Sequence, residues 1–395
     1  MPVKLESFEE LRDRLGKQLN ILVVMISDAW GGLEMTALAD TRLLVKNGFR
    51  VTFLLREGSP IDKILKMESP QIKRIYAPPK VRNYMDMSLM RILRRQIDAE
   101  GINLVHCHQT SVLGSIVPAL LARPAVALVA SRHILNDHNK KDPLHAIMYR
   151  RVDYLLVLSH TMRANILGTF PVPEKKVRAV PLAVDLARFN PRLVARESMR
   201  KEWGISDSTF LVGVVGRLDP MKGQDLLVKA LAQVTSRVSD VMGVLVGDES
   251  PGLDGVYKKE LELGISQLQM SDRMIVCPAN ADVPSALAAL DLFVMPSWSE
   301  AYGLVALEAM AMGVPCLLAG SGSAEEIARG SGSGLFRPGD AFDLARRITR
   351  LHKDAGLRDH MGSEGRKFVE EFHSTDLRLT RTLEVYARCV RRRLS

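Results

Sequence analysis

The chain has few cysteines and no long hydrophobic run. Only four of its 395 residues are cysteine. They are scattered, without the CxxC or CxxH spacing of a zinc site or a disulfide framework. No run of about 18 uncharged apolar residues occurs, and no basic segment followed by an apolar stretch opens the chain. We therefore expect reduced thiols and a cytoplasmic protein that does not span a membrane.

Two ligand-binding patterns are also missing. The strict dinucleotide fingerprint GxGxxG is absent, which counts against a nicotinamide or flavin site. No Asp-x-Asp pair is present to hold a divalent ion. The expectation is a protein without a metal or a resident cofactor.

The size and composition are those of an ordinary globular protein with more than one domain. Hydrophobic residues make up 47% of the chain and charged residues 25%, which fits neither a disordered nor a fibrous protein. A length of 395 residues predicts two domains with a cleft between them. The net charge of +9 admits nucleic acid, anionic lipid or acidic substrates as partners.

Short apolar segments alternate with helical patterns along the chain. Because these segments are apolar throughout, they predict strands of parallel sheets that are covered by helices on both faces. The predicted class is α/β, with two Rossmann-like, doubly wound parallel-sheet domains. The predicted strands are 21–26, 51–55, 72–76, 104–106, 125–130 and 154–158 in the first half, and 211–215, 242–246, 274–277, 292–295 and 316–319 in the second.

A change of pattern around Pro181 to Arg192 marks the junction between the domains. We expect an N-terminal domain over residues 1–187 and a second domain over 188–365. A helical segment over 366–395 is expected to pack back toward the N-terminal domain. Its Arg391 to Arg393 tail is interpreted as a solvated terminus.

Two glutamates bracket a predicted turn and helix after the strand 292–295. If the helix begins near Tyr302, its free N–H groups form an anion site, and Glu308 lies about two turns further along it. Ionised Glu300 and Glu308 can accept bonds from adjacent hydroxyls. Phosphate and polyol together indicate a nucleotide sugar.

A second loop, after the strand 211–215, carries two cations. Arg217 can fork two donors onto a phosphate, and Lys222 adds a compact charge. Both lie at the carboxyl end of a strand, where open α/β sheets bind ligands. A solvated basic turn is the alternative for this loop taken alone.

The first domain contributes a glycine pair and two histidines. Gly31 and Gly32 open a predicted helix after the first strand, where backbone N–H groups could approach a phosphate; turn geometry alone is the alternative. His108 follows the strand 104–106 at its carboxyl end, and His133 follows the next strand. Each is a candidate ligand for a sugar or acceptor, or a structural histidine.

Taken in order, these residues resemble the GT-B glycosyltransferases, and specifically the retaining family-four group. The resemblance implies that Arg217 and Lys222 hold the donor diphosphate and that Glu308 binds the ribose. It implies that Glu300 and the following backbone amides contact the sugar and the distal phosphate. The matching segments are Gly31-Gly32, His108, Pro181 to Pro191, Gly216-Arg217-Leu218, Lys222-Gly223, Pro296-Ser297, Glu300 to Glu308 with Tyr302, Gly303, Leu304 and Val305, Gly313-Val314-Pro315 and Pro338-Gly339-Asp340.

The chain departs from the family pattern at three places. Leu182-Ala183 stands where an Asn-Gly pair is usual, and Tyr302 replaces a phenylalanine. Pro278 replaces a glycine in the segment Cys277 to Asn280, which is expected to line the base pocket, so the base stays unassigned.

The resemblance implies transfer of a sugar from a UDP- or GDP-linked donor to a hydroxyl of a glycan or a lipid-linked acceptor, with retention and without a metal. His108, Glu300, Arg217 and Lys222 are the expected catalytic residues. Two alternatives stay open: another GT-B chemistry, such as a nucleotide-sugar epimerase or a phosphorylase, and a basic nucleic-acid-binding protein, for which no sequence pattern speaks.

A basic amphipathic pattern with Arg91, Arg94 and Arg95 also fits contact with an anionic membrane. A helix that buries its apolar side and leaves its arginines in solvent is the alternative.

Overall fold

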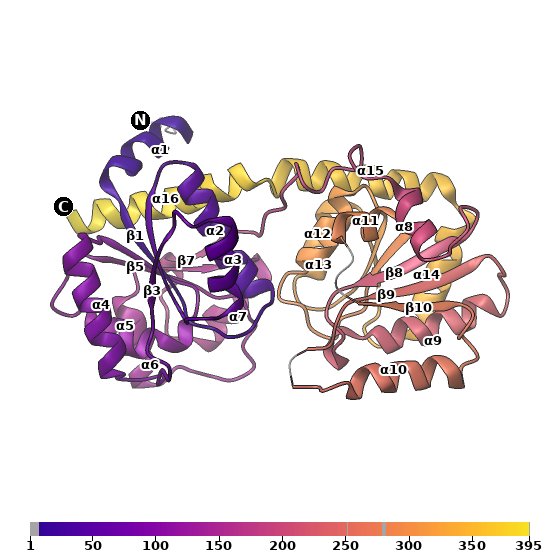
Figure 1. Ribbon diagram of the computed structural model, residues 1–395, viewed down its shortest axis with the longest axis horizontal. Coiled ribbons are helices and arrows are strands. Elements are labelled where there is room, and N and C mark those ends of the chain that lie inside the picture. The colour runs from indigo at the N-terminus through magenta and orange to yellow at the C-terminus, as the bar shows by residue number, and fades with distance from the viewer. Residues whose placement is uncertain (1–7, 251, 279–281, 395) are drawn as a thin grey trace. The chain divides into compact units, whose positions relative to one another are not determined.

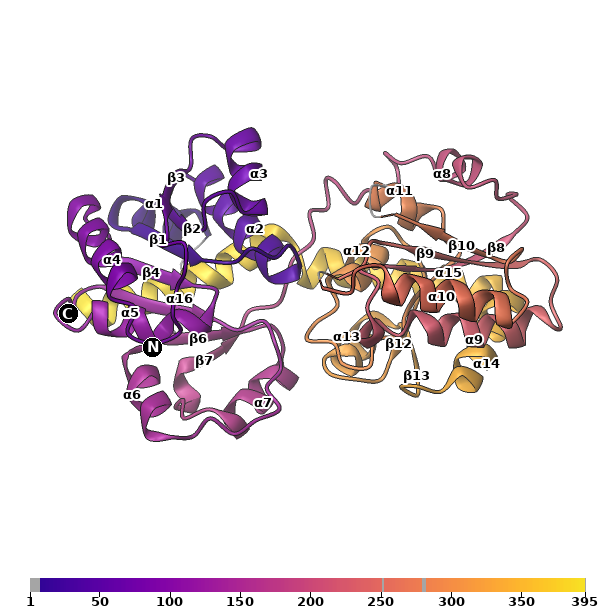
Figure 2. The same cartoon turned by 60° about the horizontal axis from the view of Figure 1, so that its bottom comes forward.

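A computed structural model describes residues 8–250, 252–278 and 282–394. The chain forms two compact units, one of residues 1–182 with 376–395 and the other of residues 183–375. Helices lie on both sides of the sheet in each unit (Figures 1 and 2). Two doubly wound parallel-sheet units were predicted, and the structure confirms them.

The first unit contains a seven-stranded parallel sheet in the order β3-β2-β1-β4-β5-β6-β7. Its strands are β1 (Asn20–Met25), β2 (Arg50–Leu55), β3 (Lys73–Tyr76), β4 (Leu104–Cys107), β5 (Ala127–Ser131), β6 (Tyr154–Val157) and β7 (Val177–Ala179). Its helices are α1 (Phe8–Gln18), α2 (Gly32–Lys46), α3 (Pro60–Glu68), α4 (Met87–Glu100), η1 (Thr110–Val112), α5 (Leu113–Ala119), α6 (Pro143–Arg151), α7 (His160–Thr169), η2 (Glu174–Lys176) and α16 (Thr375–Leu394).

The second unit contains a six-stranded parallel sheet in the order β10-β9-β8-β11-β12-β13. Its strands are β8 (Phe210–Val215), β9 (Val241–Val246), β10 (Met274–Cys277), β11 (Leu292–Met295), β12 (Cys316–Ala319) and β13 (Gly334–Phe336). Its helices are α8 (Arg196–Glu202), η3 (Pro220–Lys222), α9 (Gln224–Thr235), α10 (Val256–Gln267), α11 (Val283–Ala288), α12 (Leu304–Ala311), α13 (Ala324–Ser331), α14 (Ala341–Lys353) and α15 (Ala355–Phe372).

The predicted strands form where apolar residues run together. Every residue of β8, β11 and β12 is buried, as expected for strands covered on both faces. The sequence prediction missed β7 and β13, which have three residues each and lie at sheet edges. Strands this short carry too little apolar pattern to be recognised.

The order of the strands places one switch point in each sheet. In the first sheet the order reverses between β1 and β4, and in the second between β8 and β11. Open α/β sheets bind ligands at such points, beyond the carboxyl ends of the strands. The predicted residues Gly31 and His108 follow β1 and β4, and the two predicted loops of the second unit follow β8 and β11.

The last helix, α16, is part of the first unit's core. Arg378 forms two bonds of 2.6 and 2.7 Å with Asp40 of α2, and both side chains are buried. Arg378 also donates to the carbonyl oxygens of Val180 and Pro181. The helix therefore binds the end of the first unit's first segment, just before the chain enters the second unit at residue 183.

Two expectations about the end of the chain need correction. The predicted tail segment began at residue 366, but residues 366–372 belong to α15, which lies in the second unit. The Arg391 to Arg393 tail is not simply solvated, because Arg393 forms a 2.6 Å ion pair with the buried Asp153. In addition, the first segment of the first unit ends at Leu182, a few residues before the predicted boundary at 187.

Among the described residues, no helix is both long enough and apolar enough to cross a membrane.

Candidate active site

The loop after β8 is folded by its own polar groups. The Asp219 carboxylate accepts a 2.9 Å bond from the N–H of Met221 and a 2.6 Å bond from the Ser250 hydroxyl. Gln224 donates to the carbonyl oxygen of Arg217 across 2.7 Å. These bonds form the short helix η3 and bring Lys222 to the start of α9.

The loop after β11 leads into α12. The helix begins at Leu304, with Gly303 as its N-cap in the left-handed conformation, so Tyr302 and Gly303 precede it and the predicted start was two residues too early. The N–H groups of Leu304 and Val305 lie in the first turn, where no intrahelical acceptor exists. This end of α12 can therefore bind an anion.

The two loops meet at the switch point of the second sheet. The Lys222 ammonium lies 2.6 Å from Oε2 of Glu300, and the N–H of Trp298 donates to the carbonyl oxygen of Met221 across 3.0 Å. Gly223 has a φ of 68°, and a Cβ at this position would lie 2.4 Å from the Pro296 carbonyl oxygen. Only glycine permits this approach.

A third loop, after β12, holds the backbone on either side of Glu300. Ser321 donates to the carbonyl oxygen of Ser297, and Ser323 donates to that of Ala301 across 2.6 Å. A Cβ at Gly322 would lie 2.0 Å from the carbonyl oxygen of Glu300. Sequence reasoning did not identify these residues, and the Gly-Ser-Gly-Ser run 320–323 is the signal that could have found them.

The other two predicted residues of this site, Arg217 and Glu308, differ in exposure. Arg217 is exposed to solvent, at the carboxyl end of β8. Glu308 is buried on α12, four residues after the first residue of that helix. Burial raises the pKa of Glu308 to about 7, and the nearby charge of Arg188 acts in the opposite direction.

In the first unit, the glycine pair opens α2 as predicted. Gly31 is the N-cap and has an extended conformation, and Gly32 is the first helical residue. Among the described residues, a Cβ at Gly32 would meet no atom within 4 Å, so their packing does not require a glycine there. The hydroxyl of Ser27 donates to Glu34 across 2.7 Å and ties the loop to the helix.

Three histidines stack at the carboxyl ends of β4 and β5. The ring of His108 lies 4.2 Å from that of His106 and 5.6 Å from that of His133, measured between centroids. His106 is bonded at both nitrogens, to Tyr386 of α16 and to Ser131. Sequence reasoning did not select His106, although the His-Cys-His pattern contained it.

The electrostatics of this stack keep the rings neutral. Burial and the neighbouring ring of His133 hold the pKa of His108 well below its usual value, and burial lowers the pKa of His133 to about 3. Within the described part of the chain, both ring nitrogens of His108 are buried without a hydrogen-bond partner. A neutral imidazole of this kind can exchange hydrogen bonds with a hydroxyl.

Two further predictions concern the base pocket and the absence of a metal site. The segment expected to line the base pocket includes Ala279 and Asn280, which lie outside the described residues. Among the residues that are described, no three His, Cys, Asp or Glu side chains gather as metal ligands would.

The fold and these loops define a GT-B protein, and both halves of the chain match glycosyltransferase families. Residues 30–188 match the model of glycosyltransferase family 4, and residues 195–368 match that of the glycosyl transferases group 1. The chain therefore carries two glycosyltransferase family domains, in this order, on a GT-B fold.

Solved structures and known sequences resemble this chain over different lengths. A crystal structure of Anabaena HepE in complex with UDP superposes with a TM-score of 0.82 at 21% identity, covering 94% of this chain and all of the other. The D-inositol 3-phosphate glycosyltransferase of Salinispora arenicola is 32% identical over 60% of this chain, but the match spans only 55% of that relative.

A third relative is the UDP-Gal:alpha-D-GlcNAc-diphosphoundecaprenol alpha-1,3-galactosyltransferase of Escherichia coli. It is 24% identical, over 76% of this chain and 79% of its own length.

We predict that Gly223→Ala separates the loops after β8 and β11. The added methyl group would collide with the Pro296 carbonyl oxygen, so the free energy of unfolding should fall by about 1–3 kcal/mol beyond the cost of the left-handed backbone. Urea unfolding of the purified protein measures the change.

Gly313→Ala is the matched control. Its φ of 73° is similar, but a Cβ there meets no atom of the described chain within 4 Å, so only the backbone cost of about 1–2 kcal/mol applies. Equal losses in the two variants would show that the close approach of the loops is not constrained.

We predict that Glu308→Gln stabilises the protein at pH 8 but not at pH 4. The pKa of Glu308 is raised in the folded state, so the folded protein holds this proton more tightly than the unfolded chain does. Stability from this group is therefore present below the unfolded pKa and is lost as the pH rises through about 7.

The glutamine variant has no such loss. Its free energy of unfolding should exceed that of the parent by roughly 1–3 kcal/mol at pH 8, while the difference should shrink toward pH 4. Chemical denaturation across this pH range measures it. If the difference in free energy of unfolding between the two proteins does not change with pH, the pKa of Glu308 is not raised in the folded state.

Proposed function

We propose that the protein is a retaining, metal-independent glycosyltransferase. It moves a sugar from a UDP- or GDP-linked donor to a hydroxyl of a glycan or a lipid-linked acceptor. The observation that carries this proposal is the 2.6 Å contact of Lys222 with Glu300 at the switch point of the second sheet, beside the N-terminus of α12.

The chemistry requires neutralisation of charge. When the sugar–phosphate bond breaks, negative charge grows on the departing diphosphate. Lys222, Arg217 and the first N–H groups of α12 supply positive charge and donors for it. Glu300 accepts its contacts from Lys222 and Ser297 through Oε2, and Oε1 is the oxygen that would accept a bond from a sugar hydroxyl.

Glu308 suits a hydroxyl pair of the ribose. Ionising a buried carboxyl group costs free energy unless the carboxylate accepts hydrogen bonds. Two adjacent hydroxyls would donate such bonds. Donor binding would then lower the pKa of Glu308 from about 7 toward its ordinary range. Binding energy and ionisation of this group are thus coupled.

Retention follows if both bonds change on one face of the sugar, with the leaving phosphate oxygen taking the acceptor's proton. No separate carboxylate base is then needed. His108 would orient a hydroxyl, because its neutral ring nitrogens have no protein partner in the described chain.

The relatives support this choice of substrates. The Escherichia coli relative is named for a UDP-linked donor and a diphosphoundecaprenol acceptor, and HepE was crystallised with UDP. UDP-sugars are therefore the first donors to test. A thermal-shift screen of nucleotide sugars finds the donor, because a ligand of the native state raises the unfolding temperature.

We predict that Lys222→Ala lowers kcat for transfer by roughly 10²–10³-fold, the scale of removing one group that stabilises developing charge. The matched control is Lys229→Ala, which removes an exposed lysine paired with Asp225 on α9 and should leave kcat unchanged. Transfer of a radiolabelled sugar measures both variants, with and without a chelator.

Three results would count against the proposal: full activity in Lys222→Ala, loss of activity with the chelator, or an inverted anomeric product by NMR. Turnover without an acceptor would instead indicate an epimerase, and turnover that requires free phosphate would indicate a phosphorylase.

The proposal includes peripheral contact with an anionic membrane through α4. Leu89, Met90 and Leu93 of this helix are buried in the first unit, so its apolar side is largely used in packing. Met87, Arg91 and Arg95 are exposed, and these residues would provide a basic contact with lipid headgroups.

We predict that Arg91→Gln combined with Arg95→Gln reduces sedimentation with vesicles of anionic phospholipid several-fold, since each cation near such a surface is worth about 1 kcal/mol. Lys46→Gln combined with Arg50→Gln, at two exposed positions, is the charge-matched control. Equal sedimentation of both proteins would remove α4 from the membrane contact.

A further inference from the structure

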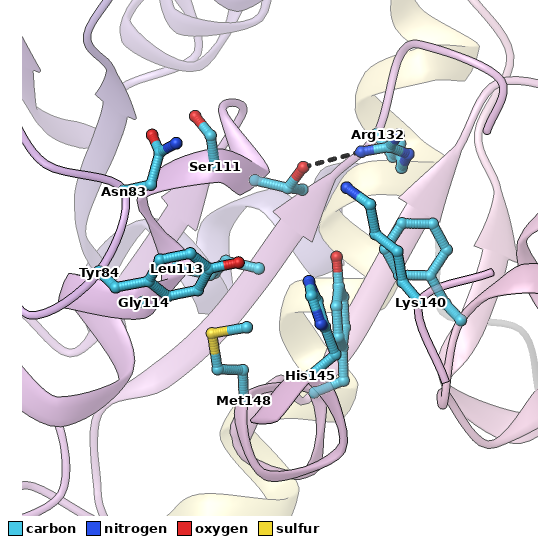
Figure 3. Close-up of a pocket in the computed structure, with 12 residues that line it drawn as sticks. Asn83, Tyr84, Ser111, Leu113, Gly114, Arg132, Lys140, His145 and Met148 are labelled. Carbon is cyan, nitrogen blue, oxygen red and sulfur yellow. Dashed lines mark hydrogen bonds between the residues drawn. The ribbon is translucent and has the colours of Figure 1, made fainter. Parts of the chain in front are cut away.

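A pocket of about 150 Å³ opens in the first unit, and none of the three stacked histidines is among its lining residues. The segments after three strands that follow one another in the chain line it, with Tyr84 after β3, Thr110 after β4, and Arg132 and Lys140 after β5. Figure 3 shows Arg132, Lys140, His145 and Tyr84 turned toward this shared space.

The guanidinium of Arg132 is held in place by neutral groups. It donates to the Thr110 hydroxyl across 3.1 Å and to the Asn136 side chain across 3.3 Å, and it lies 4.9 Å from the centroid of the Phe170 ring. Its Nε is buried without a hydrogen-bond partner among the described residues. Burial lowers the pKa of Arg132, although arginine remains charged.

Lys140 brings a second cation to the same wall. Its ammonium lies 5.6 Å from the centroid of the same Phe170 ring. Among the described residues, no Asp or Glu lines the pocket beside these two cations. Two positive charges in a partly desolvated space without a counterion are costly, and an anion would relieve that cost.

The remaining walls supply hydrogen-bond donors. Burial raises the pKa of Tyr149 to about 12, so its hydroxyl remains protonated. The Tyr84 and Ser111 hydroxyls line the space as well. Donors on several sides suit a tetrahedral group with three exposed oxygens better than a planar carboxylate with two.

We propose that this pocket binds a phosphate group carried by the acceptor substrate. The proposal rests on the proposed function and adds to it the chemical class of the acceptor. The phosphate oxygens take bonds from Arg132, Lys140 and the hydroxyls, and the phosphate then fixes the acceptor beyond the carboxyl ends of β4 and β5, where His108 also lies.

Calorimetric titration of the full-length protein tests the pocket, with glycerol 1-phosphate, inorganic phosphate and a carboxylate of similar size, glycerate, as probes. We expect saturable binding of glycerol phosphate that is weaker for glycerate. Lys140→Gln and Arg132→Gln should each weaken it by at least tenfold, since each removes a charge-assisted bond.

Lys141→Gln is the matched control, because Lys141 is exposed, is next in the chain and does not line the pocket. It should bind glycerol phosphate as the parent does. Equal weakening in Lys141→Gln and Lys140→Gln would overturn the proposal, as would unchanged binding in both pocket variants or preference for glycerate. Preference for inorganic phosphate over the ester would mean a free-anion site and would also overturn it.

Titration with UDP and GDP separates this proposal from the proposed function. If the pocket variants keep nucleotide binding but lose glycerol phosphate, both proposals stand. If the parent binds glycerol phosphate but no nucleotide, the donor assignment fails while the anion site remains.

Discussion

The close approach of two loops at the centre of the second sheet governs the candidate site. A backbone bond joins Trp298 to Met221, and a glycine at 223 allows the chain to pass against Pro296. Since both loops leave adjacent parallel strands, Lys222 and Glu300 have little freedom to separate. The free N–H groups of α12 then lie directly after Glu300 in the chain. The backbone of these two loops therefore fixes the positions of Lys222, Glu300 and the N-terminus of α12.

The parts of the fold that rest on long apolar runs could be predicted from sequence. Strands such as β8 and β11 are buried throughout, and their pattern alone indicates a parallel sheet. The candidate loops were found because polar residues follow such strands at the edge where ligands bind. The short strands β7 and β13 were not predicted, because three residues are too few to show a hydrophobic periodicity. The helix start at Leu304 depends on the left-handed turn at Gly303, which pattern alone does not fix.

Contacts between residues distant in the chain could not be predicted in this way. His106 bonds to Tyr386, which lies 280 residues later, and the anion pocket is lined from several separate loops. Each of these residues has an ordinary local context, and only folding brings them together. The pairing of Lys222 with Glu300 is of the same kind, because sequence showed two charged loops but not the distance between their charges.

The first unit is discontinuous in the chain, and this affects how the protein is made. Its core includes Leu379, Leu383 and Tyr386 of α16, and Asp40 receives its buried partner from Arg378. During synthesis the whole second unit emerges from the ribosome before these residues do, and domains generally fold in the order of emergence. Until then, the amino-terminal half holds an uncovered apolar surface and an unmatched carboxylate. Nascent chains that stop before α16 should therefore be bound by chaperones or degraded by proteases.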